Sequence, residues 1–130
     1  MKRTFAILFI LLIIVAICVA EELVLKDVNI KLNAYSSTLY DDLITNKENI
    51  NKESVKNKFS TLRKFWDNEK NKLCYLTNYD KIKSMDESVS RLKYSIDNND
   101  FSLAIDSISI VRSYSDFLHY FMGFNINNLF

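Results

Sequence analysis

The feature that most constrains this chain is its lack of turn-forming residues, because its 130 residues contain no proline and a single glycine. Turns between strands are usually built from these two residues, since proline pre-sets one backbone angle and glycine accepts a positive φ. A β-sandwich or β-barrel is therefore disfavoured. With 48% hydrophobic residues, the chain is predicted to be all-α: an N-terminal hydrophobic helix followed by a small antiparallel bundle of about four helices.

The N-terminal segment has the composition of a membrane helix. Phe5–Ala20 is an unbroken apolar run, preceded by Lys2 and Arg3 and followed by Glu21 and Glu22. At about 1.5 Å per residue the run spans roughly 24 Å, somewhat less than a bilayer core of roughly 30 Å. Basic residues before the run predict a single-pass protein of the cell membrane with its N-terminus inside and its domain outside.

Two fates of residues 1–22 remain open. They form a retained signal anchor, or a signal peptide cleaved near Ala20, which would make residues 23–130 a secreted domain. Cys18 and Ala20 supply the small residues that a signal peptidase requires, whereas helix-compatible sequence continuing through Glu21 and Glu22 favours the anchor. A lipidated Cys18 is the least favoured alternative, because bulky Ile17 precedes it.

Residues 23–130 contain four stretches of helical periodicity. Apolar residues recur at steps of three, four and five in the first stretch and at steps of three and four in the second and third. The second stretch is a heptad seam interrupted only at Glu69, and such a seam predicts lengthwise packing against a neighbouring helix. The apolar positions are Leu23, Val28, Leu32, Tyr35, Leu39 and Leu43; Val55, Phe59, Leu62, Trp66, Leu73 and Leu76; Ile82, Met85, Val89, Leu92 and Ile96; and Phe101, Ala104, Ile105, Ile108, Val111 and Leu118.

Polar residues mark the expected helix ends. The stretch Thr45–Asn51 is predicted to be the first connection, and Asp80 and Asp100 are expected to cap the third and fourth helices, since an aspartate can accept a hydrogen bond from first-turn amides. The fourth helix is expected to end at Gly123, where a left-handed residue would stop it. The apolar tail after Gly123 is expected to fold back onto the bundle.

The chain resembles a known bacterial family over most of its length, from the N-terminal hydrophobic segment to the C-terminus. The residues that carry the resemblance are Trp66, Lys70 and Leu73, then Ile82, Ser88 and Arg91–Leu92, then Asp100, Ala104–Ile105 and Asn127–Leu129. They resemble the bacterial domain of unknown function family 4363, which comprises short proteins with an N-terminal hydrophobic segment, mostly from clostridia-like Firmicutes. The family usually has histidine where Tyr79 stands here. It has no established activity, so the resemblance implies a helical architecture and a membrane location.

No residue pattern predicts catalysis. His119 is the only histidine, and the chain contains no CxxC, no HExxH and no glycine-rich phosphate loop. Adjacent carboxylates, Asp41–Asp42 and Asp86–Glu87, point about 100° apart on a helix and are expected to be solvated. No catalytic, cofactor-binding or metal-binding residue, no cofactor and no small-molecule substrate is therefore expected. Interleaved charges, 17 basic against 16 acidic, also disfavour nucleic-acid binding.

Four residues are candidates for contact with a partner: Glu69, Phe117, Tyr120 and Phe121. Glu69 is expected to form a polar notch or to pair with a basic residue across the interface, with a ligand-contacting role as the alternative. The aromatic residues are expected in the core, with a partner groove or the membrane interface as alternatives. Cys74 is expected to be a small core residue.

The sequence thus favours a membrane-tethered extracytoplasmic bundle that contacts another envelope protein or peptide. The alternative is a structural protein whose anchor helix continues into the bundle and mediates self-association. An enzyme is the third and least favoured class.

Overall fold

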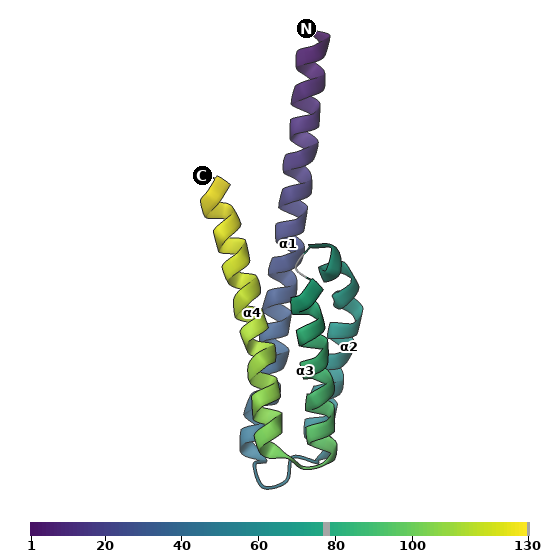
Figure 1. The fold of residues 1–130 in the computed structure, drawn as a ribbon, viewed down its shortest axis with the longest axis vertical. Helices are drawn as coiled ribbons and strands as arrows, with labels where there is room; N and C mark the ends of the chain where they lie inside the picture. The colour runs from purple at the N-terminus through teal and green to yellow at the C-terminus, as the bar shows by residue number, and fades with distance from the viewer. Residues whose placement is uncertain (77–78, 130) are drawn as a thin grey trace.

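The computed structural model shows a bundle of four helices, one of which extends far beyond the other three (Figure 1). It describes the backbone of residues 1–76 and 79–129 and the side chains of residues 1–74 and 79–116. The helices are α1 (Lys2–Thr45), α2 (Glu53–Leu76), α3 (Tyr79–Asp97) and α4 (Phe101–Leu129). The described residues contain no strand, which confirms the all-α prediction.

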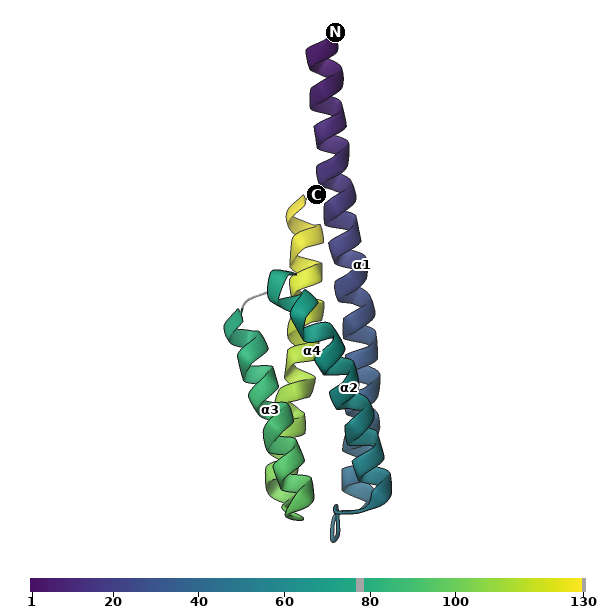
Figure 2. The same cartoon turned by 90° about the vertical axis from the view of Figure 1, so that its right-hand side faces the viewer.

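The four helices pack antiparallel in chain order. α2 lies between α1 and α3, and α4 lies between α3 and α1, so the bundle closes on itself. An even number of passes brings both chain termini to the same end, where the end of α4 stands beside the protruding part of α1 (Figures 1 and 2).

α1 is a single helix of 44 residues that contains both the apolar run and the first helix of the bundle. Its buried side chains begin at Leu25, and the full set is Leu25, Val28, Leu32, Ser36, Leu39 and Leu43. The prediction was wrong for Leu23, which is 62% exposed. Leu23 precedes Leu25 by two residues, which turns it about 200° away from the buried face.

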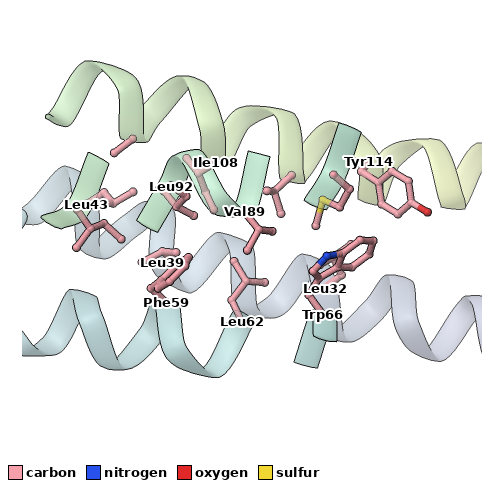
Figure 3. Packing of buried hydrophobic residues seen from close by; sticks show 14 of the residues in the cluster. Leu32, Leu39, Leu43, Phe59, Leu62, Trp66, Val89, Leu92, Ile108 and Tyr114 are labelled. Atoms are coloured by element: carbon pink, nitrogen blue, oxygen red, sulfur yellow. The ribbon is translucent and has the colours of Figure 1, made fainter. Parts of the chain in front are cut away.

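The core is a single cluster of buried side chains to which all four helices contribute (Figure 3). Its largest fully buried side chain is Trp66, whose indole packs edge-on to the ring of Tyr114 at 5.9 Å between centroids. The seams predicted for α2 and α3 are confirmed at every apolar position whose side chain is described. α4 presents the small buried residues Ala104, Ser107 and Ser115, which allow its neighbours to approach closely.

The connection between α3 and α4 is a tight reversal centred on Asn99. Asn99 has φ 52°, its N–H donates to the carbonyl of Ile96, and the N–H of Asp100 donates to the carbonyl of Ser95 at 2.8 Å. These two bonds form a Schellman motif, in which a left-handed residue closes the helix. Asp100 then caps α4 as predicted, because its Oδ1 accepts the N–H of Leu103 at 3.1 Å.

The same asparagine joins the two loops at this end of the bundle. Its Oδ1 accepts the N–H of Ile50 at 2.9 Å, and its Nδ2 donates to the carbonyl of Glu48 at 3.4 Å. Asn51 Nδ2 donates back to the carbonyl of Asp97 at 3.3 Å. We call these three bonds the loop latch. They hold Ile50, whose side chain is fully buried, as a plug at the end of the core.

Three other local predictions were wrong. Asp80 lies inside the first turn of α3, where its charge still opposes the positive end of the helix dipole. α4 continues through Gly123 to Leu129, because glycine permits a left-handed turn without requiring one and no proline follows. Cys74 is exposed, because Leu73 occupies the seam and the next residue is turned about 100° away.

The latch predicts different costs for two substitutions of Asn99. Asn99→Gly keeps the positive φ but removes the side-chain bonds, so it should cost about 1 kcal/mol of unfolding free energy. Asn99→Ala also introduces left-handed strain and should cost about 1–2 kcal/mol more. Urea unfolding of the full chain in mild detergent, followed by circular dichroism, measures both, with Asn98→Ala as the exposed control. Equal losses for the two variants would contradict the role assigned to φ.

Candidate functional site

The protruding part of α1 is the most distinctive surface of the molecule. It is long and apolar enough to cross a membrane, and none of that stretch is buried within the described structure. The side chains from Phe5 to Val19 include ten large hydrophobic residues more than half exposed. A water-exposed surface of this kind is unfavourable, and the segment is compatible with a membrane environment.

The candidate contact residues are not brought together as one site. Glu69 pairs with Lys72 on its own helix, with 3.4 Å between Oε2 and Nζ and 20% of the Glu69 side chain exposed. This ion pair therefore lies along α2, and not across the interface as expected. The side chains of Phe117, Tyr120 and Phe121, like that of His119, lie outside the described residues, although their backbone belongs to α4.

A polar cluster bridges α2 and α3 beside the core. Asp86 Oδ1 accepts the indole N–H of Trp66 at 3.0 Å and the ammonium of Lys70 at 3.3 Å. Lys70 Nζ also lies 3.4 Å from Oδ1 of Asp67. Burial lowers the pKa of Lys70, but its hydrogen bond to Asp86 and the charges of Asp86 and Asp67 outweigh that effect and raise the pKa above its ordinary value. Asp86 was expected to be only solvated. Instead its carboxylate accepts a hydrogen bond from the indole N–H, which is the one polar group of the buried tryptophan side chain. Buried polar groups are generally hydrogen-bonded in this way.

A shallow groove of about 330 Å³ lies between α2 and α3. Phe59 and Ile96 form its apolar floor, and Lys56, Ser60, Arg63, Lys93 and Asp97 form its rim. We call it the α2–α3 groove. The sequence reasoning missed it, because its cations come from helices far apart in sequence and are interleaved with acidic residues in each.

The rim of the α2–α3 groove carries a local excess of positive charge. Arg63 is paired with Asp67 at 3.7 Å. Among the described residues, Lys56 and Lys93 form no ion pair. Only one carboxylate, that of Asp97, lines the groove. Lys56 and Lys93 together outnumber this one carboxylate, and the resulting positive charge beside an apolar floor is suited to a carboxylate-bearing ligand.

The remaining groups with potential for chemistry are the acidic residues, the cysteines and the buried serines. The described side chains contain no group of three His, Cys, Asp or Glu residues that could hold a metal ion. Cys18 and Cys74 are exposed and free. Four of the five buried serines donate to backbone carbonyls of their own helices, as Ser88 does to Ser84 and Ser107 to Leu103, which is the geometry of helix-packing residues.

No protein-family model matches this chain, and neither a curated protein nor a solved structure shows significant similarity to it. The resemblance to family 4363 therefore stays a prediction.

The Lys70 pair predicts a pH dependence of stability. A raised pKa in the folded state means that the pair stabilises the fold fully below the ordinary lysine pKa of about 10.4, and that this contribution is lost as the pH rises through the folded pKa. The unfolding free energy of wild type should exceed that of Lys70→Met by less than about 1 kcal/mol near pH 8. The difference should shrink above roughly pH 10.5. Urea unfolding across this range measures it, with exposed Lys64→Met as control, and a difference that persists unchanged to about pH 11.5 would contradict it.

Proposed function

We propose that this chain is a single-pass membrane protein whose helical domain lies outside the cytoplasm and binds another protein or peptide of the cell envelope without catalysing a reaction. The observation that carries the proposal is the change of surroundings along one uninterrupted helix. α1 is exposed and apolar over Phe5–Ala20 and enters the bundle core at Leu25. Such a helix needs lipid on one part and the bundle on the other.

The charges at the two ends of the apolar run support the orientation. Lys2 and Arg3 precede the run and Glu21 and Glu22 follow it, and basic residues favour the cytoplasmic side. Retention as an anchor is favoured over cleavage near Ala20, because α1 has no break between the run and the core. Cleavage there would leave Leu25 within about one and a half turns of a frayed helix end.

The α2–α3 groove supports a binding role and indicates the chemistry of the partner. We assign it to an acidic peptide segment, whose carboxylates would pair with Lys56 and Lys93 while an apolar residue covers Phe59. The groove is lined by the first half of α2 and the end of α3, and these segments lie near the loops at the end of the bundle away from the protruding helix (Figure 2). A partner in the envelope can therefore reach it without competing with the lipid surface.

Self-association is a second candidate, and the outer face of α1 favours it. Leu23 and Ile30 are 62% and 58% exposed, and about seven residues make two helical turns, so both lie on one face. Two copies anchored in the same membrane direction would bring identical residues together about a two-fold axis.

The membrane topology predicts the fate of the intact chain in cells. Uncleaved chain should sediment with membranes, and protease added outside should digest its domain. Leu11→Arg with Ile14→Arg should release the chain from membranes, since each arginine costs about 2.5–3.5 kcal/mol near a span centre. Cell fractionation with mass measurement of the N-terminus tests this. A soluble species beginning near Glu21 would replace the anchor with a secreted domain, and a protease-protected domain would refute the orientation.

The groove predicts a charge-dependent contact. A photo-crosslinking residue at Ser60, on the groove rim, should capture an envelope protein in intact cells through a peptide rich in Asp and Glu, as identified by mass spectrometry. Lys56→Glu with Lys93→Glu should reduce this capture at least about tenfold, equivalent to about 1.4 kcal/mol. The matched pair Lys64→Glu with Lys83→Glu makes the same change in net charge outside the groove and should leave capture intact.

The same measurement separates the two candidates. A cross-linker at Ile30 that yields only a product of twice the chain mass, with no product from Ser60, would favour self-association. Equal loss of capture in both charge-reversed pairs would remove the groove as the contact surface.

A further inference from the structure

The last segment of α4 differs in composition from the rest of the bundle. Charged residues are interleaved along the domain up to Asp116, but residues 117–130 contain no Asp, Glu, Lys or Arg. Five of these residues are Phe or Tyr. The backbone remains helical to Leu129, so this uncharged segment continues along the axis of α4.

A hydrogen bond fixes the axial register of α4 against α1, that is, which residues of the two helices lie at the same level along the bundle. The Ser115 hydroxyl donates to Oδ1 of Asn29 at 2.6 Å. The two helices are antiparallel neighbours with the same rise of about 1.5 Å per residue, so each later residue of α4 lies level with an earlier residue of α1. Phe124 is therefore about level with Ala20, and Leu129 with Val15. The opposite ends agree, since the N-terminus of α4 lies beside the loop after α1, where Lys47 stands over the Phe101 ring at 5.7 Å.

This register brings the uncharged segment to the level of the apolar run. Residues 124–129 lie level with its last residues, and residues 117–123 lie level with the charged stretch Glu21–Asp27 that comes after it. Figures 1 and 2 show the same arrangement, with the end of α4 extending beyond α2 and α3 on the side of the protruding helix.

We infer that residues 117–129 of α4 contact the membrane that α1 crosses, with residues 117–123 at the headgroup level and residues 124–129 at the edge of the acyl layer. The inference rests on the proposed membrane span of α1 and adds a second attachment to it. Two attachments on neighbouring helices would fix both the height and the tilt of the bundle above the lipid.

The composition of this end of the bundle fits a membrane interface. Tyrosine is enriched at the headgroup level because its ring is amphipathic, and phenylalanine is favourable in the adjoining acyl layer. A further tyrosine lies at the same height on α3. Met85 and Tyr114 line one small pocket between α3 and α4, so they lie at about the same level. Tyr79 is six residues before Met85, and Tyr120 is six residues after Tyr114. Because the two helices are antiparallel, Tyr79, which is 66% exposed, comes level with about Tyr120.

The end of α4 also limits how deeply it inserts. The last four carbonyls of a helix lack partners within it, and each costs several kcal/mol when hidden from water in lipid. The residues from Phe124 to Leu129 extend only about 9 Å along the axis. Shallow contact with one leaflet therefore fits the segment, whereas a second membrane crossing does not.

Fluorescence quenching by lipid tests this contact in the full chain. The only tryptophan, Trp66, is fully buried in the bundle and provides a constant background. Phe124→Trp and Ile126→Trp place reporters in the segment, Val15→Trp places one in the span, and exposed Ser109→Trp is the control on α4. Each variant is reconstituted in phosphatidylcholine vesicles with and without bromine near the headgroup end of the acyl chains.

Bromine should reduce the added fluorescence of the Phe124→Trp, Ile126→Trp and Val15→Trp variants at least about twofold and leave Ser109→Trp and wild type unchanged. Quenching of Val15→Trp without quenching of either α4 reporter would overturn the inference and leave the proposed span intact. Failure of all three would overturn the span itself. The α4 tryptophans could instead escape bromine quenching and become shielded from water only at a high protein-to-lipid ratio. That result would assign the segment to contact between copies of the chain and overturn the inference.

Discussion

The rest of the structure depends on one constraint, the continuity of α1 from its exposed apolar run into the core of the bundle. No glycine or proline lies between Ala20 and Leu25, and the helix does not break there. These five steps correspond to about 7.5 Å of helix, so the bundle core begins almost where the apolar run ends. α2 and α4 both pack on α1. The direction of the protruding helix therefore sets the direction of the whole bundle, with no linker to uncouple them.

The polar contacts between helices of the bundle set the axial register of neighbouring helices. The bond from Ser115 to Asn29 sets the level of α4 on α1, and the bond from Trp66 to Asp86 does so for α2 on α3. Asp42 links α1 to α2, since its carboxylate accepts Ser54 Oγ at 3.1 Å and lies 3.3 Å from Lys58 Nζ. Apolar seams alone tolerate sliding by a heptad. One polar bond at each of these interfaces excludes that slip, because a displaced partner would leave a polar group unsatisfied.

Periodicity in the sequence predicted the local features of the bundle, whereas features that depend on contacts between distant segments were missed. The seams of α2 and α3 and the cap at Asp100 are local patterns, and they are confirmed. Ile50 lies in a polar loop, and only the latch to Asn99, from another loop, explains why it is buried. The α2–α3 groove has the same origin, since Lys56 and Lys93 come from different helices. For the candidate contacts, composition identified the aromatic cluster of α4, but its level beside α1 required the register of the two helices.

The two ends of the bundle have opposite surface chemistry, and the fold explains why they are suited to different partners. Lys58 of α2 contacts Asp42 of α1, which places the nearby α2–α3 groove roughly 30 Å along α1 from Ala20. With α1 spanning a membrane as proposed, the charges of the groove would lie farther from the lipid than the screening length of about 8 Å in physiological salt, so anionic headgroups would not occupy the groove. At the end beside the apolar run, by contrast, α4 carries no Asp, Glu, Lys or Arg after Asp116. A rigid α1 would hold these two surfaces at a fixed separation, so that attachment at one end presents the basic groove outward at a defined height.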